Sequence, residues 1–171
     1  MAYGIQATVG RPNGPIASAT VTKVLLSIHV LAAIVAIGPV TVAASMYPAA
    51  VRRGDVPAMR TLHRICRVYA ALGVVVPVFG LATASSLGVL GDAWLLTSIA
   101  LTVLAAAVLG LLVLPSQAKA LSDDENGQKR EQAKEQERAA RRIGMLAGVF
   151  NLLWAVVVVL MITRPGATTG A

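Results

Sequence analysis

Four long stretches of apolar residues, free of Asp, Glu, Lys and Arg over about 20 residues or more, dominate the chain. Stretches of this length and composition are typical of helices that cross a membrane. We predict spanning helices over residues 22–47, 68–90, 94–114 and 143–162. The predicted fold class is therefore all-α, a polytopic membrane protein with four transmembrane helices in an up-down bundle.

Breaker and turn residues set the boundaries of a single domain at 22–162. Pro48 and the pair Arg52–Arg53 follow the first stretch, Gly91–Asp92 favours a tight turn after the second, and Pro115 is expected to end the third. The connections are then loops over 48–67 and 115–142. Residues 1–21 and 163–171 are expected to be outer tails.

Two further prolines, Pro39 and Pro77, lie inside the first and second stretches, where they predict kinked helices.

The basic residues are distributed unevenly, and this distribution predicts the topology. The net charge is +7, and 12 of the 15 Lys and Arg residues lie in the loops 48–67 and 115–142. The positive-inside rule places these loops in the cytoplasm and both termini outside. We predict a bacterial inner (plasma) membrane protein whose basic residues set its orientation in the lipid bilayer, and we expect no nucleic-acid partner.

The apolar stretches contain no carboxylate or base to carry a coupling charge or to act in acid–base catalysis, and the chain has no metal-protease, phosphate-loop or CxxC motif. We therefore expect no enzymatic activity, no catalytic residue and no protein-bound metal ion.

Apart from Lys23 at the outer edge of the first predicted span, His29 is the one acidic, basic or histidine side chain within the predicted spans. At a rise of about 1.5 Å per residue, it lies in the outer half of the membrane with Thr83, Ser98 and Thr102, so these four form a candidate polar patch. A neutral histidine between helices either hydrogen-bonds a neighbouring helix or binds haem b or copper. A second axial ligand would have to come from a partner chain, because His63 lies at the cytoplasmic side.

Small residues recur on one face of each span, where they let helix backbones approach closely. We expect helix packing at Gly73, Gly80, Gly144, Gly148 and Asn151, with Gly144 and Gly148 forming a GxxxG contact.

The segment from His29 to Gly38, followed by Leu62-His63-Arg64 before the second span, resembles a bacterial family of small four-span predicted integral membrane proteins of unknown function. The first helix is also distantly similar to copper-resistance-type and cytochrome-b-like helices, in which the histidine binds metal or haem. In place of their Trp-x-Gly-Gly ending, this chain has Ala36-Ile37-Gly38-Pro39.

The leading functional hypothesis is a non-enzymatic accessory or scaffold subunit that packs against a larger membrane complex or a second copy of itself, without a cofactor. The alternative is a haem-b or quinone-associated electron-transfer or sensor module that uses His29. A small-molecule permease fits least, because no polar pair for a substrate lies at the membrane midplane.

Overall fold

The computed structural model describes residues 15–125 and 133–166, and all of its regular structure is helical. The elements are α1 (Pro15–Arg53), α2 (Val56–Leu72), α3 (Val75–Leu87), α4 (Ala93–Ala107), the π-helix η1 (Val108–Val113), α5 (Leu114–Glu125) and α6 (Ala133–Thr163). The outermost parts of both predicted tails (1–14 and 167–171) and part of the third connection (126–132) lie outside the described residues.

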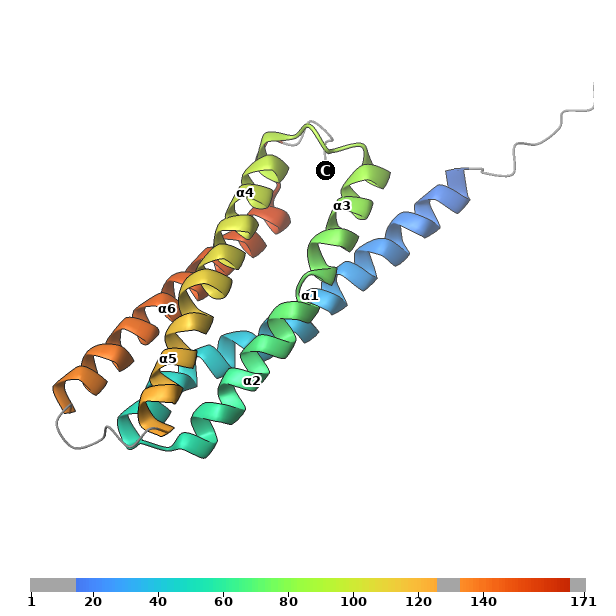
Figure 1. Ribbon diagram of the computed structural model, residues 1–171. Coiled ribbons are helices and arrows are strands. Elements are labelled where there is room, and N and C mark those ends of the chain that lie inside the picture. Colours follow the sequence, from blue (N-terminus) through green and yellow to red (C-terminus); the bar gives the residue numbers. More distant parts are fainter. Residues whose placement is uncertain (1–14, 126–132, 167–171) are drawn as a thin grey trace, which may run out of the picture.

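The elements form four rods, each with a segment long enough to cross a membrane, and the rods alternate in direction (Figure 1). Helix α1, the α2–α3 pair, the α4–η1–α5 run and α6 each include an apolar segment long enough to cross a membrane. The predicted all-α, four-helix up-down bundle is therefore confirmed. We call the end with the α1–α2 turn and the tip of α5 the basic end, and the end with the α3–α4 turn the opposite end.

The first connection is much shorter than the predicted loop 48–67, because α1 continues to Arg53 and α2 begins at Val56. Gly54 makes the turn with a φ of 61°, a conformation that glycine adopts without steric cost. Asp55 then caps α2, since its carboxylate accepts the Ala58 N–H at 3.0 Å. The predicted loop is thus a two-residue turn between two helices.

The second rod is interrupted between α2 and α3, at Gly73 and Val74. Pro77 has no N–H to donate to the Gly73 carbonyl four residues earlier, and the Val76 N–H donates to that carbonyl instead, at 3.1 Å. The proline therefore produces a break in the helix. In contrast, α1 remains continuous across Pro39 and Pro48.

The sequence predicted that the third helix ends at Pro115. In the structure the third rod continues past this proline to Glu125. The turns before the proline widen into η1, and the Leu114 N–H donates to the Leu109 carbonyl five residues earlier. A π-turn places an extra residue in the helix, which accommodates the backbone donor missing at Pro115. Part of the predicted loop 115–142 is therefore helical.

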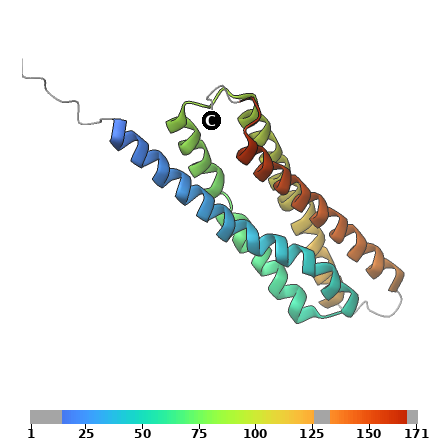
Figure 2. The same cartoon turned by 180° about the vertical axis from the view of Figure 1, so that it is seen from behind.

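Helix α1 is central to the packing, since it contacts α2, α3 and α6, while α4 packs on α6 and α2 on α5. Seen from behind, the first residues of α1 extend away from the other helices (Figure 2). Only 11–22% of each apolar segment is buried within the chain. The exposed remainder includes large side chains such as Leu111 and Ile162, as expected for helices surrounded by lipid.

Candidate functional site

His29 lies on α1 and packs against α3 in the half of the bundle near the opposite end. Its side chain is half-buried, and its Nδ1 is 2.9 Å from the carbonyl oxygen of Val76. Because a carbonyl oxygen can only accept, Nδ1 carries the proton and donates it. In the tautomer that carries its proton on Nδ1, the lone pair is on Nε2, the nitrogen that could bind a haem iron or accept a hydrogen bond.

Gly80 provides the space for this ring. A Cβ built on Gly80 would lie 2.9 Å from Cε1 of His29, a distance that real Cβ atoms essentially never show, and 3.2 Å from Nδ1. Any larger residue at position 80 would therefore displace the imidazole from Val76. Gly80 and the Val76 carbonyl together fix the orientation of the ring.

The three hydroxyl residues of the candidate patch are not joined to His29 by hydrogen bonds within the described part of the chain. Thr83 on α3 donates to Phe79 O, while Ser98 and Thr102 on α4 donate to Trp94 O and Ser98 O. A helical hydroxyl always has the carbonyl four residues earlier within reach, and all three use it. The patch is thus a set of separately satisfied groups.

The residues expected to pack helices differ in what they meet. Gly144 on α6 faces α1, where an added Cβ would be 3.5 Å from Cγ of Pro48, and Gly73 ends α2 close to Ile37 of α1. Asn151 also faces α1, donating to Ser45 Oγ at 3.0 Å, although its buried Oδ1 has no partner among the described residues. Gly148 is exposed, and an added Cβ there would meet nothing within 4 Å. Only half of the predicted GxxxG pair therefore packs within the chain.

A second polar cluster, which the sequence did not predict, lies near the basic end. Gln117 of α5 is fully buried. Its Oε1 accepts from Nδ1 of His63 at 3.1 Å, its Nε2 donates to Sγ of Cys66 at 3.7 Å, and its carbonyl accepts the Tyr47 hydroxyl at 2.7 Å. One glutamine thereby links the first three rods.

Two features concealed this cluster. Gln117 lies beyond Pro115, in the segment expected to be a loop, and His63 and Cys66 lie in the other predicted loop. The spacing of three residues between His63 and Cys66, which places both on one face of a helix, was the available signal.

The charged surface at the basic end adds contacts between α1 and α6. Glu137 accepts from Nε of Arg52 on α1 and from Nε of Arg141 on its own helix, both at 3.1 Å.

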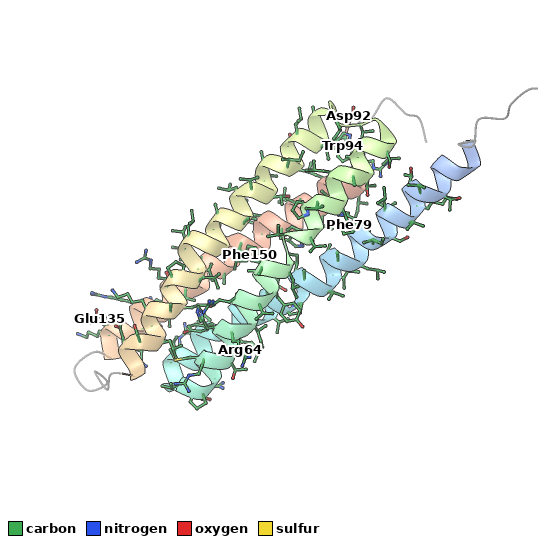
Figure 3. The ribbon with its side chains drawn as sticks, turned by 45° about the vertical axis from the view of Figure 1, so that its right-hand side comes forward. Arg64, Phe79, Asp92, Trp94, Glu135 and Phe150 are labelled. Carbon is green, nitrogen blue, oxygen red and sulfur yellow. The ribbon has the colours of Figure 1, made fainter. Side chains whose placement is uncertain are left out.

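Asp92 and Trp94 mark the opposite end, and Arg64 lies toward the basic end (Figure 3). Within the described residues, no three His, Cys, Asp or Glu side chains gather in a way that could hold a metal ion.

Comparison with known proteins identifies one family. No curated protein and no solved structure matches the chain. The model of a family described as predicted integral membrane protein (DUF2269) matches residues 23–165, which include α1 from Lys23 onward, the other three rods and both histidines. The chain therefore belongs to the DUF2269 family of predicted integral membrane proteins.

Proposed function

We propose that this integral membrane protein is a non-enzymatic accessory or scaffold subunit that packs against a partner helix through a small-residue face of α6. The observation that carries this proposal is the outward position of Gly148. Its neighbours on that face are Met145 and Leu152, whose exposed fractions are 66% and 67%.

A glycine on a lipid-facing surface has a cost and no benefit within the chain. Glycine in a helix interior is less favourable than alanine by about 1 kcal/mol. Facing a second helix, however, it lets the two backbones approach closely enough to gain van der Waals contacts. The first partner to test is a second copy of the chain; a larger membrane complex is the other.

The experiment measures association in phosphatidylcholine vesicles by energy transfer between labelled copies. Gly148→Leu should abolish transfer that the unmodified chain shows. Gly110→Leu is the matched control, because Gly110 is also exposed with nothing within 4 Å of an added Cβ but lies on η1. Equal transfer in both variants, or none in the unmodified chain, would reject self-association through this face.

The orientation proposed for the protein is that of a bacterial inner-membrane protein with the basic end in the cytoplasm and both termini outside. The concentration of 12 of the 15 basic residues in the segments 48–67 and 115–142 supports it. The Arg52–Glu137 and Arg141–Glu137 pairs compensate only part of this charge.

The second candidate function is a haem-b or quinone-associated electron-transfer or sensor module, and the state of His29 favours it. A histidine that ligates metal usually donates its other ring N–H to a carbonyl, as Nδ1 of His29 does to Val76. Nε2 would then bind the iron of haem b or would accept a hydrogen bond from a hydroquinone. For haem, the second ligand would be His29 of a second copy.

An absorbance spectrum of the purified protein, oxidised and dithionite-reduced, tests the haem candidate. If the protein binds haem, we expect a Soret band that shifts on reduction. The band should disappear in His29→Leu and persist in His63→Leu. A spectrum with only the protein band would reject haem binding.

A further inference from the structure

An open groove of about 660 Å³ lies between α5 and α6 at the basic end. Lys119 and Asp123 of α5 form one side, and Lys134, Glu135, Arg138 and Arg142 of α6 form the other. The volume is in the range of small-molecule sites. It is the charge of these walls that indicates a ligand.

The groove has an excess of positive charge. Four bases face two carboxylates, a difference of +2. None of the four bases has an ion pair within the described part of the chain, whereas Arg52 and Arg141, outside the groove, share Glu137. Repulsion among the four bases, which two carboxylates offset only in part, favours the uptake of an anion.

The spacing of the bases suits an anion with several oxygens. Lys134, Arg138 and Arg142 follow one another at intervals of four, so they form a column along one face of α6. Lys119 faces this column from α5. Guanidinium groups offer paired N–H donors that match phosphate oxygens, and donors from two helices can contact opposite sides of the same group.

The position of the groove along the bundle identifies the source of the phosphate. Arg142 directly precedes the buried Ile143, where the apolar segment of α6 begins, and Ser116 in the groove follows the apolar end of η1. Leu112 precedes Ser116 by four residues and Met145 follows Arg142 by three, and both are exposed, at 42% and 66%, so exposed apolar side chains come next along both helices toward the membrane. A phosphate in the groove would thus have apolar surface for acyl chains directly beside it.

From this arrangement we propose that the α5–α6 groove binds the phosphate headgroup of an anionic phospholipid with about two negative charges, such as phosphatidic acid or a diphosphate lipid. The bases of α6 and Lys119 hold the phosphate oxygens, and the acyl chains lie along Leu112 and Met145. The same chemistry would accept free phosphate or pyrophosphate, so the experiment separates the two sources.

Native mass spectrometry of the full-length protein, titrated with phosphatidic acid in neutral detergent, measures the dissociation constant. The groove variant is Lys119→Gln with Arg138→Gln. The control is Arg53→Gln with Arg141→Gln, which removes the same charge from exposed positions outside the groove. Each lost base should raise the dissociation constant for phosphatidic acid about fivefold. The groove variant, which loses two bases, should therefore bind about 25-fold more weakly. The control should change less than about twofold, because charge outside the groove acts through solvent.

Equal weakening in both variants would overturn the proposal, because it would show attraction to the whole basic surface. Pyrophosphate and inorganic phosphate form the second arm. They should neither displace phosphatidic acid nor raise the unfolding temperature. If they bind the unmodified protein as tightly as the lipid does, and the groove variant loses that binding, the lipid assignment is wrong.

Discussion

At the scale of single residues, the polar side chains inside this bundle are positioned by backbone carbonyls and by glycine. His29 has a carbonyl partner on another helix and a glycine beneath its ring. Thr83, Ser98 and Thr102 use carbonyls of their own helices. A polar group in hydrocarbon needs a partner, and the nearest carbonyl is always available. His29 and the Gln117 cluster, like Asn151 with its bond to Ser45, instead connect helices that are distant in the sequence.

The contact between Gly80 and His29 predicts a coupled pair of substitutions. Gly80→Ala should lower the free energy of unfolding by about 1–3 kcal/mol, since the methyl group overlaps the imidazole. In a His29→Ala background the same change should be nearly neutral, because the space is then free. Gly110→Ala, with nothing near an added Cβ, is the control for glycine replacement itself. A loss of equal size in both backgrounds would mean that the ring does not occupy this position.

The Gln117 cluster gives a second residue-scale prediction. Gln117→Leu should cost about 0.6–1.7 kcal/mol of stability, because the Nδ1–H of His63 loses its acceptor. Replacing both Gln117 and His63 by Leu should recover most of this loss, since no donor is then left unpaired. Reversible unfolding in mixed detergent is the measurement. Strictly additive effects of the two substitutions would rule out a direct hydrogen bond.

At the scale of elements, the sequence predicted the rods but not all of their ends. Runs without charge identified four spans, because burying a charge in lipid is costly whatever the tertiary structure. The predicted helix end at Pro115 was wrong. An internal proline usually ends a helix, but here the π-turn at Leu109–Leu114 lets the helix continue. Whether a proline kinks, breaks or is absorbed depends on neighbouring helices, and local sequence does not encode them.

The same limit explains the candidate sites. The residue types and depth of His29 were evident from the sequence, whereas its partner Val76 depends on the relative rotation of α1 and α3. Gly148 and Gly144 share a spacing that suggested one interface, yet only Gly144 faces α1. Rotation about a helix axis is set by the whole bundle, so spacing alone could not distinguish the two glycines.

The turn between α1 and α2 yields a prediction at this scale. Asp55→Ala should reduce stability by about 1 kcal/mol, because the Ala58 N–H at the start of α2 loses its side-chain acceptor. Asp55→Asn, which retains an acceptor oxygen, should unfold at nearly the temperature of the unmodified protein. If Asn and Ala are equally destabilising, the carboxylate acts through its charge and not as a cap.

At the scale of the whole molecule, the two ends of the bundle are chemically different. The basic end combines the Glu137 pairs, the α5–α6 groove and the Gln117 cluster. The opposite end is closed by Trp94, which donates to Asp92 at 2.9 Å and lies beneath the guanidinium of Arg164. Because the rods between them are largely apolar outside and thinly packed inside, the membrane is a structural component of the fold. The orientation of the molecule then decides which compartment each end meets.

That orientation can be tested with single cysteines in a Cys66→Ala background. Gly91→Cys, in the exposed turn at the opposite end, should react with a membrane-impermeant maleimide on intact bacterial cells. Ser122→Cys, exposed near the tip of α5, should react only after permeabilisation, because the proposed orientation, based on 12 of the 15 bases, places that end in the cytoplasm. The unmodified chain, in which Cys66 is the one cysteine, is the separate control, since its fully buried thiol should stay unlabelled in both conditions. Labelling of Ser122→Cys but not Gly91→Cys on intact cells would show the opposite topology. The proposed phospholipid groove would then face the outer leaflet.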